Sequence, residues 1–188
     1  MSTPSPKFSI LYADPPWRYK SGSIRGAVPY PCLSTAEIAA LPITTICERD
    51  CLLFLWATYP MLPDALEVMR AWGFVYKTTA FTWVKLNPSG LGFHFGMGNW
   101  TRANPEICLL GVKGKPKRVA RNVPNLIIAP RRAHSHKPDE IRGRIVALCG
   151  DLPRVELFAR QKTSGWLVWG NEVESDIGLR SGCRRTLV

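Results

Sequence analysis

The segment CLLFLWA, residues 51–57, constrains the fold of this chain more than any other stretch. An unbroken apolar run of this length, without the alternation of a half-exposed strand, is typical of a strand buried on both faces. The next segment, MLPDALEVMRAWG, places Leu62, Leu66 and Met69 at helical spacing and ends on Gly73, which favours a helix with a glycine cap. A buried strand that leads directly into an amphipathic helix is typical of α/β folds.

The other apolar segments extend this pattern to a whole sheet. Further strands are predicted over residues 8–13, 74–86, 106–113, 125–130, 154–160 and 165–171. One further helix is predicted over residues 35–41, after a capping box of Ser34 and Glu37. Another is predicted from Pro138 to Gly150, with Asp139 and Glu140 in its first turn. We therefore predict a single α/β domain over residues 1–188, with a mostly parallel sheet and helices on both faces.

Length and composition limit the compartment and the class of site. The chain has 188 residues, of which 46% are hydrophobic, and this is enough for one domain with its own core. Its N-terminus lacks a secretory pattern, and no apolar run reaches the ~18 residues of a membrane span. Only Cys47 and Cys51 lie close together, with no second pair to complete a zinc site. We therefore expect reduced cysteines, no metal and a cytoplasmic location.

The chain is strongly basic. It has 25 lysine and arginine residues against 14 acidic ones, a formal net charge of +11, which predicts a polyanionic partner. No acidic residue occurs between Ile107 and Pro138, a stretch that contains Lys113, Lys115, Lys117, Arg118, Arg121, Arg131, Arg132 and Lys137. Alone, this run is compatible with a solvated loop. Together with the overall charge it favours phosphate contacts, and Lys115, Lys117 and Arg118 are candidates for them.

Residues 10–19, ILYADPPWRY, end the first predicted strand with a carboxylate and two prolines. Ligands of open parallel sheets bind beyond the carboxyl ends of the strands, where Asp14 is expected. Proline keeps the residue before it extended, and because Pro15 and Pro16 lack an N–H, we expect nearby carbonyls to have no local partner. The Asp14 carboxylate and the Pro15 carbonyl would then form a row of acceptors beside Trp17. The alternative is that Asp14 caps a turn and Trp17 packs in the core.

Such a row of acceptors suits the exocyclic amine of a nucleobase. The amine has two hydrogens to donate, while its lone pair is delocalised into the ring and is a poor nucleophile. Acceptors in the correct plane favour a more pyramidal nitrogen and aim its lone pair at an electrophile, which is catalysis by positioning and electrostatics. We therefore take Asp14, Pro15, Pro16 and Trp17 as the candidate catalytic motif.

The motif ADPPW after a hydrophobic strand resembles the acceptor motif of amino-group methyltransferases. With its final tryptophan, the motif resembles that of the MT-A70 family in particular. The resemblance covers roughly residues 8–172. It includes the segments PYPCLSTAEI, LLFLWATYPMLPDALEVMRAWGF, FTWVKLNP, GMGNWTRANPEICLLGVKGKP, AHSHKPDEIRGRI, VELFAR and WGNE, in that order. It implies the Rossmann-like fold of class I methyltransferases in a circularly permuted order, with the acceptor motif near the N-terminus and the donor-binding strand near the C-terminus.

The resemblance also implies S-adenosylmethionine as the methyl donor. The implied donor-binding residues are Asp14, Tyr30, Lys137, Glu156, Arg160, Asn171 and Glu172. Lys137 stands next to the predicted helix start, whose dipole would also favour the donor carboxylate. Without the family, a salt bridge between Glu156 and Arg160 is the simpler interpretation. Lys162 and Thr163 depart from the histidine and asparagine of the family's messenger-RNA enzyme, so they are left outside the donor set.

On the acceptor side, the resemblance implies stacking of the target base and phosphate contacts. Trp17, Tyr30 and Trp100 are the aromatic candidates, and an adenine in a duplex would have to be flipped out to reach them. Arg102 is a candidate for a phosphate or base contact. Glu106, by contrast, is expected to anchor the start of its strand.

These features predict a DNA N6-adenine methyltransferase of bacterial or bacteriophage type. The same chemistry on RNA is an alternative, because the active site does not distinguish the two. A non-catalytic nucleic-acid-binding subunit is another, although the presence of both Asp14 and Trp17 favours an active enzyme. With few residues beyond the catalytic core, sequence recognition is expected to be short or to need a second copy in a homodimer.

Overall fold

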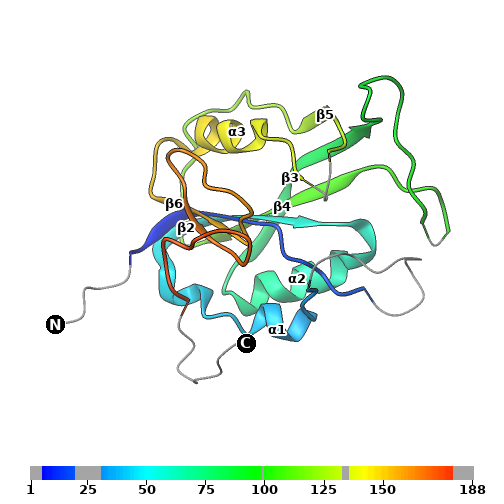
Figure 1. The fold of residues 1–188 in the computed structure, drawn as a ribbon. Coiled ribbons are helices and arrows are strands. Elements are labelled where there is room, and N and C mark those ends of the chain that lie inside the picture. The colour runs from blue at the N-terminus through cyan, green and yellow to red at the C-terminus, as the bar shows by residue number, and fades with distance from the viewer. Residues whose placement is uncertain (1–5, 20–30, 99, 133–135, 180–188) are drawn as a thin grey trace.

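The computed structural model describes residues 6–19, 31–98, 100–132 and 136–179 (Figure 1). Its centre is a seven-stranded sheet in the order β5-β3-β4-β2-β1-β6-β7. The strands are β1 (Phe8–Ala13), β2 (Cys47–Ala57), β3 (Val75–Leu86), β4 (Glu106–Lys113), β5 (Leu126–Pro130), β6 (Arg154–Leu157) and β7 (Leu167–Trp169). The helices are α1 (Thr35–Ala39), α2 (Leu62–Ala71) and α3 (Glu140–Cys149), with short 3-10 turns η1 (Ile43–Ile46) and η2 (Tyr59–Met61).

The sheet is mostly parallel, as predicted. β1 pairs in parallel with β2 and β6, β3 with β5, and β6 with β7. Among the described strands only β4 runs the other way, antiparallel to both β2 and β3. The carboxyl ends of the six parallel strands therefore meet at one edge of the sheet, and the first residue of β4 lies at that same edge.

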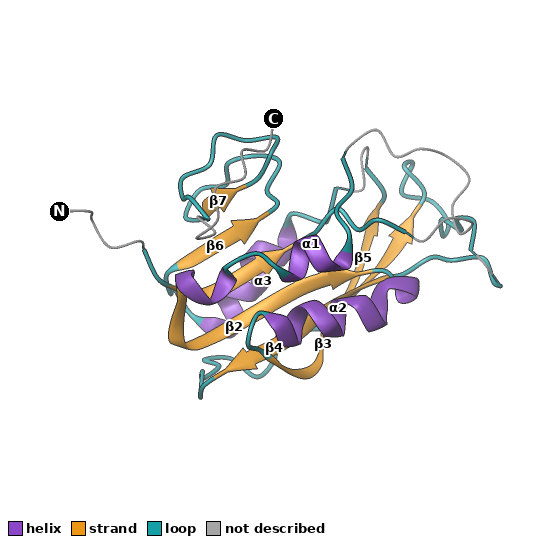
Figure 2. Ribbon diagram, turned by 90° about the horizontal axis from the view of Figure 1, so that it is seen from below, coloured by secondary structure: helices purple, strands orange, loops and turns teal. Residues whose placement is uncertain are grey.

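Helices cover both faces of the sheet, which confirms the predicted α/β fold with a Rossmann-like arrangement. α3 lies on one face, and α1 and α2 lie on the other (Figure 1), with α2 in front of the sheet in the view from below (Figure 2). Side chains that alternate along β1 fill two cores. Leu11 and Ala13 pack on the side of α1 and α2, whereas Ile10 and Tyr12 pack on the side of α3. Packing on both faces fixes the position of β1 and therefore the position of Asp14, the residue that follows it.

The local helix signals are largely confirmed. Ser34 and Glu37 form the predicted capping box, in which the Glu37 carboxylate accepts the Ser34 N–H at 2.8 Å. Gly73 follows α2 with a φ of 80°, a conformation that glycine adopts without a steric cost. The start of α3, however, lies at Glu140 and not at Pro138. Asp139 is the residue before the helix, and its carboxylate accepts hydrogen bonds from arginine side chains instead of the helix N–H groups.

Strand boundaries differ from the prediction where the backbone turns away from the sheet. β2 begins earlier, at Cys47, with an exposed stretch before the buried run of residues 51–57. β6 ends at Leu157, three residues earlier than predicted, because Phe158 adopts a left-handed φ of 61° that no strand can continue. No helix in the described part of the chain is long and apolar enough to cross a membrane. In those same ranges, no cluster of three or more histidine, cysteine or acidic side chains could hold a metal ion.

Candidate active site

The segment after β1 is held in place by the segment that precedes α1. The Pro16 carbonyl accepts the Leu33 N–H at 2.9 Å, and the Leu33 carbonyl accepts the Arg18 N–H at 2.9 Å. Asp14 follows the last residue of β1 and projects from the carboxyl edge of the sheet. It is thus held between β1 on one side and the anchored Pro16 on the other. This is the place where open parallel sheets bind ligands.

The expectation that the proline carbonyls lack local partners is wrong. The Pro15 carbonyl accepts the Trp17 N–H at 2.9 Å in a tight three-residue turn, and Leu33 occupies the Pro16 carbonyl. The reason is that each proline lacks only its own backbone N–H. The N–H of Trp17 is still available to donate to the Pro15 carbonyl. A carbonyl oxygen has two lone pairs, so Pro15 keeps one acceptor position for a ligand.

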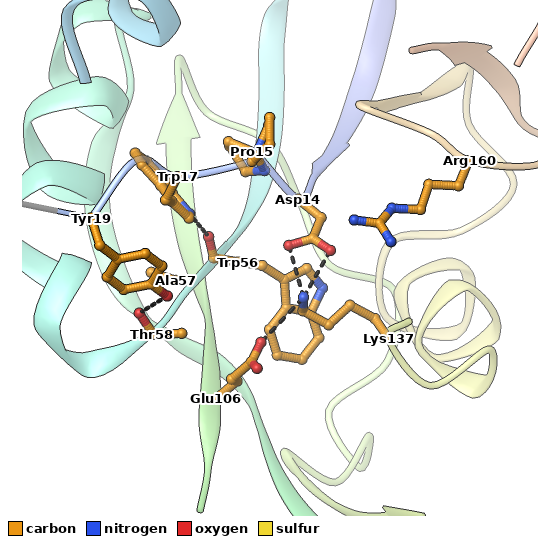
Figure 3. A pocket seen from close by; sticks show the side chains of 11 residues that line it. Asp14, Pro15, Trp17, Tyr19, Trp56, Ala57, Thr58, Glu106, Lys137 and Arg160 are labelled. Carbon is orange, nitrogen blue, oxygen red and sulfur yellow. Dashed lines mark hydrogen bonds and ion pairs between the residues drawn. The ribbon is translucent and has the colours of Figure 1, made fainter. Parts of the chain in front are cut away.

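Trp17 packs in the core, as the alternative interpretation expected. Its side chain is buried, and its indole N–H donates to the Trp56 carbonyl at 3.1 Å. The same ring also lines a hollow of about 60 Å³ together with Asp14 and Pro15 (Figure 3). Core packing and a place in the hollow are therefore compatible for this side chain.

A partly buried ion pair joins Asp14 to Lys137. The Lys137 ammonium lies 2.8 and 2.7 Å from the two Asp14 carboxylate oxygens and 3.1 Å from the Glu106 carboxylate (Figure 3). It also lies 5.4 Å from the centre of the Trp56 ring, within the range of a cation–π contact. The predicted acceptor residue Asp14 and the predicted donor-binding residue Lys137 are thus brought together at one point.

Burial and neighbouring charges shift the pKa of each member of this cluster. Burial raises the pKa of Asp14 above its ordinary value, although the Lys137 ammonium opposes the rise. Burial alone would lower the pKa of Lys137, but Asp14 and Glu106 outweigh it, so the net pKa is raised. Lys137 is therefore a permanent cation at neutral pH.

Glu106 has a larger place in the site than the sequence suggested. It is buried, and besides Lys137 it contacts Lys85 at 2.5 Å, so four alternating charges run from Asp14 to Lys85. The two lysines outweigh the effect of burial and lower the pKa of Glu106. Its expected role as an anchor of β4 is compatible with these contacts. Its contact with Lys137 follows from the antiparallel direction of β4, which places the first residue of that strand at the site.

A second hollow adjoins Asp14 and is lined by several of the predicted donor-binding residues. It has a volume of about 30 Å³, shares Asp14, Lys137 and Arg160 with the first hollow, and is also lined by Arg142 and Glu156. The Arg142 guanidinium donates to both oxygens of the Glu156 carboxylate, at 2.7 and 2.8 Å. Burial raises the pKa of Glu156, and Arg142 opposes this rise. Sequence reasoning missed Arg142, which lies in the first turn of α3, within the segment AHSHKPDEIRGRI but without a role assigned to it.

The salt bridge considered between Glu156 and Arg160 is not the one that the structure has. Arg160 contacts Glu172 at 3.4 Å, so the ends of β6 and β7 are joined by this pair instead. Gly170 lets the two chain segments after β6 and β7 approach each other closely. A Cβ atom at this position would lie only 2.1 Å from the Ala159 carbonyl oxygen. Asn171, exposed like Glu172, follows directly after this close approach.

A much larger cavity, of about 560 Å³, is lined by two of the predicted substrate-binding residues, Trp100 and Arg102. It shares Tyr19, Thr58 and Glu106 with the Asp14 hollow, and Trp100 and Arg102 line it farther out. Trp100 is 98% exposed. The Arg102 guanidinium donates to the carbonyls of residues 95 and 96 and so braces its own loop. The other predicted aromatic, Tyr30, lies outside the described residues.

The structure does not bring Lys115, Lys117 and Arg118 to this site. They are exposed and follow the last residue of β4, and the Lys115 N–H donates to Asp50, near the beginning of β2. Because β4 is antiparallel, its eight residues carry the chain roughly 25 Å away from the Asp14 edge. A direct contact of these three residues with a base at Asp14 is therefore excluded.

Comparison with known proteins identifies the family. The MT-A70 family matches residues 8–172. The chain is 34% identical to the type II methyltransferase M.MunI of Mycoplasma sp, over 90% of this chain and 79% of that protein. It is also 34% identical to the human N(6)-adenosine-methyltransferase catalytic subunit METTL3, over 89% of this chain but only 28% of that protein. The chain therefore belongs to the MT-A70 family of N6-adenine methyltransferases.

Proposed function

We propose that this protein transfers a methyl group from S-adenosylmethionine to the N6 amine of adenine in DNA. The observation that carries the proposal is the position of the Asp14 carboxylate. It stands at the carboxyl edge of β1, an interior strand of the sheet, in a hollow that adjoins a charged hollow on one side and a large cavity on the other. A target amine and a methyl donor could thus reach Asp14 from opposite sides.

Asp14 would hold the amine and orient it. Its carboxylate can accept one amine hydrogen, and the remaining lone pair of the Pro15 carbonyl can accept the other. The amine nitrogen then forms a bond to the methyl carbon while the bond from that carbon to sulfur breaks, and the sulfur keeps the electron pair. The proton of the resulting cationic amine passes to Asp14 or to water. Positioning and electrostatic stabilisation supply the rate enhancement.

The residues of the donor side fit the chemistry of S-adenosylmethionine, which supplies an electrophilic methyl group on a sulfonium. The Lys137 ammonium can meet a carboxylate, and the Asp14 carboxylate can meet an ammonium. This pair therefore matches the carboxylate and the ammonium of an amino-acid group. On binding, the donor carboxylate would pair with Lys137 and the donor ammonium with Asp14. The Glu156 carboxylate, held by Arg142, and the outer residues Arg160, Asn171 and Glu172 are proposed to hold the rest of the donor. Tyr30, which lies outside the described residues, is proposed for the same role from the family resemblance.

The preference for DNA rests on the likeness to the type II methyltransferase M.MunI, which extends over 90% of this chain and 79% of that protein. A net charge of +11 suits a polyanion, either DNA or RNA. The chain spans about a quarter of the length of the adenosine methyltransferases that it matches. Lys115, Lys117 and Arg118 would contact phosphates of a DNA segment that extends away from the target base, with Trp17 beside the base itself and Trp100 in the adjoining cavity.

A transfer assay tests this function. Labelled S-adenosylmethionine is incubated with the protein and with DNA and RNA oligonucleotides of matched sequence, and the products are digested to nucleosides. We expect label in N6-methyldeoxyadenosine. Label in the RNA product alone would show that the substrate is RNA and not DNA. Absence of methylated adenine from both would overturn the proposal and favour a non-catalytic subunit.

A further inference from the structure

The large cavity beside Asp14 has more room than the target base requires. The hollow at Asp14 measures about 60 Å³ and admits only the amine edge of a purine, so the ring must extend into the adjoining cavity. That cavity measures about 560 Å³, within the ~300–1,000 Å³ of sites for drug-sized ligands. Building on the proposed function, we propose that this cavity also binds the base next to the target adenine, from an unpaired strand.

The outer wall of the cavity is made of exposed apolar side chains. Trp100 is 98% exposed, Met97 81% and Tyr59 51%, and all three line the cavity. Grouped exposed side chains of this kind mark a ligand site more often than a structural one. Aromatic side chains bind unpaired bases by stacking, and they do so without a requirement for a particular base.

Hydrogen bonds brace the described part of the loop that carries Met97 and Trp100. The Asn104 side chain accepts the Lys85 N–H at 3.0 Å and donates to the carbonyls of Lys85 and His94. Arg102 clamps the carbonyls of residues 95 and 96, and Gly96 pairs with Ala103 through two backbone hydrogen bonds. The site is thus formed before a ligand arrives, which reduces the entropy lost on binding.

Positive charge lies on the His94 side of the same cavity. Arg102 and His94 line the cavity, and burial and then the charges of Arg131, Lys85 and Arg102 lower the pKa of His94. Lys85 is paired with Glu106, so Arg102 and Arg131 supply the charge that remains. A nucleotide has an apolar base and an anionic phosphate, so a cavity with an apolar wall and positive charge on one side is complementary to it.

A pair of polar side chains lies where the two parts of the site meet. The Tyr19 hydroxyl and the Thr58 hydroxyl lie 2.8 Å apart, and both residues line the Asp14 hollow as well as the cavity (Figure 3). A target base with its amine edge at Asp14 and a neighbouring base against Trp100 would be splayed apart. Such an arrangement requires a strand whose bases are unpaired at this point.

Oligonucleotides with an abasic site test this inference. Single-stranded DNA with one target adenine is prepared with its neighbouring nucleotides intact, with an abasic 5′ neighbour or with an abasic 3′ neighbour. Binding is measured by fluorescence anisotropy, and methylation by initial rates. We expect the abasic site on one side to weaken binding and raise KM by roughly 5- to 150-fold, the range of base stacking on aromatic side chains, with little change in kcat.

Variants of the loop make the test specific. Trp100→Ala should show the same loss with intact DNA and should no longer distinguish intact from abasic substrate. Leu91→Ala is the matched control, because Leu91 is 78% exposed on the same loop but does not line the cavity. Insensitivity of binding to an abasic neighbour on both sides would overturn the inference. Neighbour-dependent binding without methylation would leave it standing and overturn the proposed function.

Discussion

The ammonium of Lys137 contacts both carboxylate oxygens of Asp14, at 2.8 and 2.7 Å, although 123 positions separate the two residues. This contact joins the end of β1 to the segment before α3, and Glu106 at the start of β4 completes it. Three segments far apart in the sequence thus meet at the carboxyl edge of the sheet. The position and ionisation of Asp14 depend on all of them.

The pH dependence of catalysis should report the surroundings of Asp14. Burial raises its pKa, so the acid limb of kcat/KM should lie above the ~3.9 of an unperturbed aspartate, because the carboxylate must be ionised to accept the amine hydrogens. Lys137 opposes that rise, and Lys137→Met should therefore move the limb to higher pH. Rates measured from acidic to neutral pH at saturating donor check this. A limb that stays in place or moves to lower pH in the variant would contradict the assignment.

The Arg142 and Glu156 pair should behave as a coupled buried unit. Arg142→Met leaves a Glu156 side chain that is 9% exposed without its partner, and we expect a loss of ~3–5 kcal/mol in the free energy of unfolding. In the double variant Arg142→Met with Glu156→Gln, no charge remains unpaired, and much of the loss should be recovered. Urea unfolding of the four proteins in the cycle measures the coupling. Additive losses would show that the two side chains act independently.

Two glycines should respond in opposite ways to alanine. A Cβ at Gly170 would meet the Ala159 backbone at 2.1 Å, so Gly170→Ala should destabilise the protein by ~1–3 kcal/mol and weaken donor binding through the adjacent Asn171. Gly143, in α3, has open space around its Cβ position, and Gly143→Ala should stabilise by ~0.5–1 kcal/mol. Thermal melting and donor titration check both. Equal effects on stability would show that the close approach is unimportant.

The basic residues beyond β4 should act only on long substrates. Replacing Lys115, Lys117 and Arg118 together by glutamate should weaken the binding of a duplex of several helical turns and reduce its salt dependence. Binding of an oligonucleotide of a few residues should not change, because the three residues lie roughly 25 Å from the Asp14 edge. Affinities for both lengths across a salt series check this. Equal weakening for both lengths would place these residues near the target base.

Sequence reasoning recovered the features that depend on local chemistry. The capping box at Ser34, the bounds of β4 and the exit of Asp14 from β1 all follow from the residues at those positions. It did not recover the direction of β4, because an apolar run of eight residues has the same pattern in a parallel or an antiparallel strand.

That one direction accounts for two of the differences between prediction and structure. An antiparallel β4 brings Glu106 to Lys137 and carries Lys115 and its basic neighbours to the opposite edge. A parallel β4 would instead have placed Lys115 near the Asp14 edge and Glu106 at the opposite edge. The partner of Glu156 was missed for a related reason, since Arg142 reaches it only through the packing of α3 on the sheet.

The central claim is that the Asp14 carboxylate holds the amine that receives the methyl group, and Asp14→Asn tests it most directly. The substitution keeps the shape of the side chain and removes its charge. Single-turnover methyl transfer is measured with saturating donor and DNA, alongside the affinity for each. We predict that the rate falls by ~10²–10³-fold or more while DNA binding persists. Transfer at the original rate by a folded Asp14→Asn protein would contradict the account.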